Sequence, residues 1–200
     1  MKRLVVPSVA LAATGLLNSA CGTTDTTLRS MSTSTMPAML SAAAMSPAAD
    51  HNDADVKFSQ MMIPHHRQAV EMAKLAEAQA SRPEVKDLAQ RIEAAQAPEI
   101  QTMSGWLRSW GVQVPSRGAM TMDHGVPGMM SEQAMKKLEG LSGAAFDKAF
   151  LEMMIHHHEG AVSMAEDEQR HGAYEPAKQL AGSIISSQSA EITTMKDLLQ

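Results

Sequence analysis

Hydrophobic residues recur three and four positions apart in four long stretches of the chain, a spacing typical of amphipathic helices. Clusters of Gly and Pro separate these stretches, and Asp53 or Asp55 can cap the first of them. The predicted helices cover residues 53–80, 83–110, 131–139, 142–171 and 176–199. Because short turns join the first long helix to the second and the third to the fourth, the pattern predicts an all-α fold, an antiparallel four-helix bundle made of two helical hairpins.

The two hairpins are copies of one unit. A shift of 92 residues aligns positions 58–107 with 150–199 without a gap, and 20 of the 50 aligned positions are identical. The repeat units span about 55–110 and 147–199, and a loop rich in Met, His and Gly joins them at 112–130. Many identities are Met, His, Gln and Glu rather than aliphatic residues, so the repeat preserves chemistry as well as packing.

The N-terminal third has no helical periodicity after a short apolar stretch. Residues 1–20 have two basic residues, an apolar run and small residues at the end, which is typical of an export signal. Cys21 follows in a context that resembles a bacterial lipobox, although Asn18 stands where Leu is usual; an ordinary secreted or periplasmic protein is the alternative. Residues 21–53 resemble a flexible tether rich in Thr, Ser, Ala and Met, and 54–200 form the expected bundle domain.

Composition and charge narrow the class of partner. Met accounts for 18 of the 200 residues, aromatic residues make up only 3%, and the formal net charge is −5. Since Lys and Arg do not cluster beyond the first residues, nucleic acid is not expected as a partner. The acidic run 166–168 and the residues Glu71, Lys74 and Glu77 are interpreted as solvent-facing.

Polar side chains fall on the core-facing side of the predicted helices. At 100° per residue, His65 lies in the middle of the apolar stripe of its helix. A turn near residue 82 then places His65 opposite Glu99 and Met62 opposite Met103. In the second unit, the same construction places His157 opposite Glu191 and Met153 opposite Met195. The same residue types therefore converge twice.

Two interpretations account for these buried polar groups. A His–Glu hydrogen bond satisfies both partners without a metal, and methionine fills gaps in helical cores. A metal site is favoured by the duplication of the pair, the adjacent histidines and the thioethers one turn away. Imidazole and thioether together select copper, with Cu(I) favoured over Cu(II), whereas zinc would require more His or Cys.

The motifs FSQMMIPHHRQAVEMA and FLEMMIHHHEGAVSMAEDE, with QAPEIQTM and QSAEITTM, closely resemble the DUF305 family over residues 55–199. The resemblance implies a ferritin-like four-helix bundle, usually exported, of which some members bind copper. Carried over by motif, the implied ligands are Met61, Met62, His65, His66, Met72, Glu99 and Met103 in the first unit and Met153, Met154, His157, His158, Met164, Glu191 and Met195 in the second. His156 stands where the motif usually has Pro and adds a candidate, and Met120, Met122, His124, Met129 and Met130 form a weaker Met/His segment.

The expected function is that of a cell-envelope copper-binding protein, lipid-anchored at Cys21, which sequesters copper or exchanges it with a donor or acceptor protein. No catalytic residues are assigned. A ferritin-like metal oxidoreductase is one alternative, although neither unit has the Glu-x-x-His motif of di-iron bundles. A metal-free scaffold or interaction module is the other alternative.

Overall fold

The computed structural model describes residues 51–116 and 125–200. Within them the chain is helical and has no strand, as predicted. The helices are α1 (Asp53–Gln79), α2 (Pro83–Ser109), α3 (Glu132–Glu139), α4 (Gly143–His171) and α5 (Glu175–Leu198). The leader, Cys21, most of the proposed tether and residues 117–124 lie outside the described residues.

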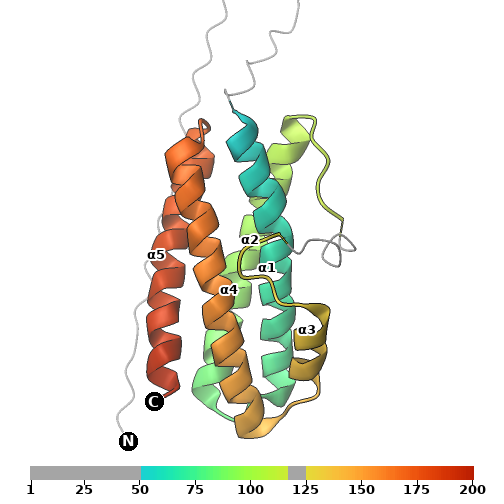
Figure 1. Ribbon diagram of the computed structural model, residues 1–200, viewed down its shortest axis with the longest axis vertical. Coiled ribbons are helices and arrows are strands. Elements are labelled where there is room, and N and C mark those ends of the chain that lie inside the picture. The colour runs from blue at the N-terminus through green and yellow to red at the C-terminus, as the bar shows by residue number, and fades with distance from the viewer. Residues whose placement is uncertain (1–50, 117–124) are drawn as a thin grey trace, which may run out of the picture. The chain divides into compact units, whose positions relative to one another are not determined.

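The four long helices form two hairpins that meet through their first helices. α1 packs along α2, α4 packs along α5, and α1 and α4 lie side by side and run in opposite directions (Figure 1). α1 continues through Pro64, and α2 continues through Pro98. The short helix α3 packs against α4. The predicted bundle of two helical hairpins is therefore confirmed.

Two buried aspartates hold the turns of the hairpins. Asn52, rather than Asp53 or Asp55, is the N-cap of α1, and Asp55 completes a capping box with it. Asp55 also accepts hydrogen bonds from the backbone N–H groups of Ala173 (3.2 Å) and Tyr174 (2.9 Å), in the turn between α4 and α5.

Asp147, on α4, fixes the turn between α1 and α2 in the same way as Asp55 fixes the turn between α4 and α5. It accepts hydrogen bonds from the N–H groups of Ser81 (3.0 Å) and Arg82 (3.2 Å) and from the Ser81 hydroxyl, in the turn between α1 and α2. Asp55 and Asp147 are equivalent positions of the repeat. Each hairpin therefore supplies the carboxylate that fixes the turn of the other hairpin.

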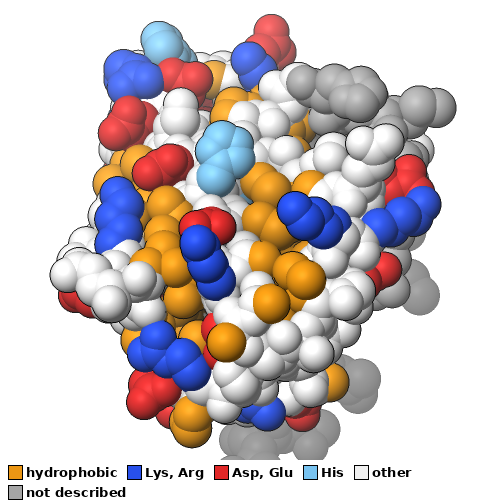
Figure 2. All heavy atoms as spheres, turned by 60° about the horizontal axis from the view of Figure 1, so that its bottom comes forward, with side chains coloured by type: hydrophobic (Ala, Val, Ile, Leu, Met, Phe, Trp, Pro, Cys, Tyr) orange, Lys and Arg blue, Asp and Glu red, His pale blue; other side chains and the backbone are white. Residues whose placement is uncertain are grey.

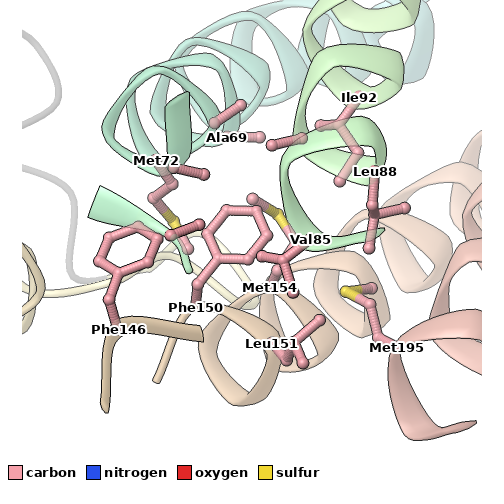
Figure 3. Packing of buried hydrophobic residues seen from close by; sticks show 14 of the residues in the cluster. Ala69, Met72, Val85, Leu88, Ile92, Phe146, Phe150, Leu151, Met154 and Met195 are labelled. Atoms are coloured by element: carbon pink, nitrogen blue, oxygen red, sulfur yellow. The ribbon is translucent and has the colours of Figure 1, made fainter. Parts of the chain in front are cut away.

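Two hydrophobic clusters fill the interior, one toward each end of the bundle. The first, which we call the α3-side cluster, contains the stacked rings of Phe146 and Phe150, with centroids 5.8 Å apart, and the side chain of Leu138 from α3. Figure 3 shows the thioethers of Met72, Met154 and Met195 among its rings and aliphatic side chains. The second, the turn-side cluster, contains Phe58, Met62, Ile63, Met103, Leu107, Val126, Ala161, Met164, Ala165, Ala177, Ala181 and Ile184.

The face in Figure 2 carries side chains of both charge signs, interspersed with exposed strips of hydrophobic side chains. Such mixing is typical of a solvated surface. None of the helices in the described ranges has the length and apolar character needed to cross a membrane.

Candidate metal centre

Two equivalent histidines stack where α1 and α4 lie side by side. The ring centroids of His65 and His157 are 3.6 Å apart with an interplanar angle of 33°, and both side chains are fully buried. Along each helix, the histidine lies between the residues of the α3-side cluster and those of the turn-side cluster. The centre of the molecule therefore contains polar rings between two apolar regions.

The rings of His65 and His157 are poorly paired within the described residues, although the backbone carbonyls of Pro127 and His157 lie near the His65 ring. Neither ring nitrogen of either histidine makes a hydrogen bond of normal geometry. Burial lowers the pKa of His65 well below its usual value, and the neighbouring His66 and His158 lower it further. Burial, followed by His65 and His158, lowers the pKa of His157 in the same way. Both imidazoles are therefore neutral at physiological pH, which is the form that binds metal ions.

The adjacent histidines point into their own hairpins and meet the glutamates. Nε2 of His66 lies 2.6 Å from a carboxylate oxygen of Glu99, and Nε2 of His158 lies 2.7 Å from Glu191. The predicted pairing of His65 with Glu99 and of His157 with Glu191 was therefore wrong by one residue. A rotation of 100° turns His66 toward α2, whereas His65 faces α4.

These His–Glu pairs leave one ring nitrogen free. The Nδ1 atoms of His66 and His158 are buried and have no hydrogen-bond partner in the described structure. Glu99 and Glu191 each keep 20% of their side chains exposed. A carboxylate on one nitrogen of an imidazole fixes the ring and makes the other nitrogen a better metal ligand. The pairs can thus serve as a packing device or as oriented ligands.

A short segment, residues 125–130, lies across α1 and α4 (Figure 1), and we call it the strap. Gly128 of the strap lies close to the backbone carbonyl of His157. The side-chain amide of Gln68 donates to the carbonyl of Met130 (2.9 Å) and accepts from its N–H (2.7 Å). On α4, a side chain at Gly160 would clash with the carbonyl of Pro127. The Cα of Gly128, a residue with φ +76, also lies against Gly160 and would clash with a side chain there. The Pro127 carbonyl lies close to the His65 ring and raises the pKa of His65, but burial lowers this pKa by more.

The methionines do not group by repeat unit. The side chains of Met72 from the first unit and Met154 and Met195 from the second lie in the α3-side cluster, and Met153 packs against it. Conversely, the turn-side cluster takes Met62 and Met103 from the first unit and Met164 from the second, with Met61 packed against it. The predicted proximities of Met62 to Met103 and of Met153 to Met195 agree with this division. It was not predicted that Met72 would pack with the methionines of the second unit and Met164 with those of the first.

A pocket of about 470 Å³ opens beside the turn-side cluster, between the first half of α1 and the last half of α4. Both Met61 and Met164 line it, together with Phe58, Pro127 and Glu168. Glu168 is 1% exposed, so the interpretation of this residue as solvent-facing was wrong, whereas Glu166 and Asp167 are exposed. Eleven residues after His157, Glu168 lies on nearly the same side of α4, and this spacing was the signal that could have identified it.

Burial, together with the hydrogen bond and the charge of the neighbouring Asp55, raises the pKa of Glu168 to about 8. Burial also acts on Asp55, but the backbone hydrogen bonds of Asn52, Tyr174 and Ala173 and its contact with Glu168 hold its pKa below the usual value. At neutral pH Glu168 therefore carries a proton beside an ionised Asp55.

The remaining candidate metal ligands are exposed, belong to the strap or lie outside the described residues. His156 is exposed, unlike His157 and His158, and Met129 and Met130 belong to the strap and are partly buried. Met120, Met122 and His124 lie outside the described residues.

The donors present suit a soft ion better than a hard one. In the part of the chain that the structure describes, no three side chains of His, Cys, Asp and Glu converge closely enough to hold an ion. An ion bound near the histidines would therefore complete its coordination with thioether sulfur or backbone oxygen. Buried imidazole nitrogens without partners, with thioethers in the adjoining clusters, fit Cu(I).

Comparisons with known proteins identify the family of the chain. The family model described as "Domain of unknown function (DUF305)" matches residues 55–199. A DUF305 protein from Streptomyces coelicolor is 38% identical over 73% of this chain and 91% of its own, with a TM-score of 0.67. CopM in its Cu(II)-bound form is 37% identical over 73% of this chain and 95% of its own, with a TM-score of 0.65, and CopM in its Cu(I)-bound form is 34% identical over 72% and 94%, with a TM-score of 0.59. No curated protein matches the chain. The chain belongs to the DUF305 family.

Proposed function

We propose that the bundle binds copper as cargo and holds it at its centre, for sequestration or for exchange with a donor or acceptor protein. The single observation that carries the proposal is the buried His65–His157 stack, whose ring nitrogens make no hydrogen bond of normal geometry within the described residues. Polar atoms left without partners in an interior cost free energy, and a bound ion would compensate for that cost.

The surrounding residues support copper over other ions. Cu(I) prefers imidazole and thioether donors, and the adjoining clusters contain methionines from both repeat units. The Nδ1 atoms of His66 and His158 are further buried donors, each on a ring held by a glutamate. The relative CopM has been solved with Cu(I), Cu(II) and silver bound. Cu(I) is the oxidation state that we favour for this chain.

The test is a titration of the protein with Cu(I) in competition with a chelator. We expect at least one equivalent to bind, and the double variant His65→Leu/His157→Leu to lose this binding. The matched control is His51→Ala, because His51 stacks on Trp110 and is not a candidate ligand. Unchanged Cu(I) affinity in the folded double variant would overturn the proposal and favour a metal-free scaffold.

The placement of this activity in the cell envelope is part of the proposal. Residues 1–20 would be removed as an export signal, and residues 21–53 would tether the bundle to a lipid on Cys21. The relative from Streptomyces coelicolor is described as a secreted protein. Mass spectrometry of the mature protein tests the anchor: an N-terminal diacylated Cys21 is expected, and an unmodified mature terminus would contradict it.

A further inference from the structure

The groove between α1 and α4 is open at one end and covered at the other, although both ends are built from equivalent positions of the repeat. At the open end, Met61 and Met164 line the pocket of about 470 Å³. Of their repeat equivalents, Met72 belongs to the α3-side cluster and Met153 packs against it, as does α3 through Leu138. Equivalent methionines are similarly buried at the two ends, but those at the first end line a pocket and those at the second pack beside α3.

The pocket also contains a buried carboxyl group, that of Glu168, which lies beside the carboxylate of Asp55. Glu168 lines the pocket and is 1% exposed, and neither of its oxygens makes a hydrogen bond of normal geometry within the described ranges. Its neighbour Asp55 is engaged by the backbone N–H groups of Asn52, Ala173 and Tyr174. A buried acidic pair of this kind is stabilised when a cation lies beside it.

Other residues of the pocket agree with a cationic ligand of soft character. Asp167 adds a second acidic group at the rim, and Lys57 and His171 are the basic and titratable residues that face the same space. The walls are the apolar side chains of Phe58 and Pro127 and the two thioethers. Thioether sulfur binds soft monovalent ions and has little affinity for hard ones such as Mg²⁺ or Ca²⁺.

We propose that this pocket is the site through which Cu(I) is loaded and released, with Met61 and Met164 as the first ligands and the Asp55–Glu168 pair, which shares one negative charge, as the acidic group beside them. The inference rests on the proposed function and adds a direction to it. Met61 lies one helical turn before His65 on α1, so an ion bound at the pocket is one step along the helix from the central stack. At the opposite end of the described structure, α3 and the α3-side cluster occupy the corresponding positions.

The first experiment measures the rate at which the full-length protein takes Cu(I) from a chelator complex. We expect the double variant Met61→Leu/Met164→Leu to take up copper at least tenfold more slowly than the wild type. The matched control is Met135→Leu, because Met135 is a partly buried methionine of α3 that packs at the covered end; its rate should equal that of the wild type.

The second experiment follows the methionine methyl groups by NMR, in protein labelled at these positions, while Ag⁺ is added below one equivalent. We expect the signals of Met61 and Met164 to shift first, before those of Met72 and Met153. Equal uptake rates for the double variant and the wild type would overturn the proposal, as would first shifts at the covered end.

The two proposals fail in different ways. If His65→Leu/His157→Leu keeps its Cu(I) affinity but Met61→Leu/Met164→Leu is slow, the central site is wrong and the pocket assignment stands. If the histidine variant loses copper but the methionine variant loads at the wild-type rate, the central site stands and the pocket assignment is overturned. A wild-type protein that binds neither Cu(I) nor Ag⁺ overturns both.

Discussion

The two ends of the α1–α4 groove differ in composition at equivalent positions. At the covered end, Ala76 and Leu75 stand where the open end has Glu168 and Asp167, and Ala149 stands where it has Lys57. The methionines and one phenylalanine, Phe58 or Phe150, are kept at both ends, whereas Phe146 has Ala54 as its equivalent. One end has thus been filled with apolar groups and covered by α3, while the other keeps polar groups around a pocket. Two copies of a repeat can therefore keep the same helical framework while their equivalent positions differ in polarity and packing.

The largest expected effect comes from the aromatic residues at the two ends. Phe150→Ala at the covered end should lower the free energy of unfolding by about 3–5 kcal/mol, because the ring is fully buried and α3 prevents the site from collapsing. Phe58→Ala at the open end should cost about 1–2 kcal/mol less, since its ring lines a pocket that water already reaches. Urea denaturation of both variants measures the difference. Equal losses would show that the two ends are equally well packed.

The next effect concerns the dependence of stability on pH. Because the pKa of Glu168 is raised from 4.5 to about 8, the folded protein holds a proton that the unfolded chain releases. The contribution of Glu168 to stability is therefore unfavourable above pH 4.5, grows as the pH rises to about 8, and is constant beyond that. Glu168→Gln should be more stable than the wild type at pH 8 by on the order of 2 kcal/mol and should match it near pH 4.5. Thermal unfolding across this range is the measurement, and parallel curves would contradict the assignment.

A smaller effect is expected at the strap, which lies between the two ends. Gln68→Ala removes both hydrogen bonds to the backbone of Met130 and should cost about 1–2 kcal/mol. Faster amide hydrogen exchange should be confined to residues 125–130, because the helices keep their own hydrogen bonds. Exchange that rises throughout α1 and α4 would show instead that the strap holds the helices together.

The smallest effect is expected on the exposed side of α3. Lys136 and Glu132 form an ion pair of 2.7 Å, but both side chains are largely exposed, so water and salt screen it. Lys136→Ala should leave the urea midpoint unchanged. A measurable loss would mean that the cover at this end depends on charge as well as on Leu138.

Helical periodicity predicted the fold closely because each long helix has one clear apolar side and the turns contain Gly or Pro. The ends of the helices agree with the structure within about one residue, apart from the first cap, where Asn52 replaces the predicted aspartates. The register of each hairpin was wrong by one residue, since the centre of a short turn locates facing positions only to that accuracy. This error exchanged His65 for His66 as the partner of Glu99.

Contacts between the two repeat units could not be predicted in the same way. A short turn fixes how α1 faces α2, but a long connection joins α2 to α4 and leaves the relation of α1 to α4 undetermined. The stack of His65 on His157 and the shared pocket of Met61 and Met164 are contacts of this kind. The contacts of Asp55 and Asp147 with the turn of the other hairpin were missed because the alignment of the repeat began three residues later, at Phe58 and Phe150.

The stacking of two equivalent histidines has a consequence for the origin of the fold. A residue that contacts its own repeat equivalent lies on an approximate twofold axis, as in a symmetric homodimer. The exchange of Asp55 and Asp147 between hairpin turns has the same character. An ancestral gene that encoded one hairpin would therefore have specified the whole central site through self-association. Duplication and fusion would then have freed each copy to diverge. Gln68 is the repeat equivalent of Gly160, and Ala76 is the equivalent of Glu168. A homodimer of identical hairpins could not have acquired such differences.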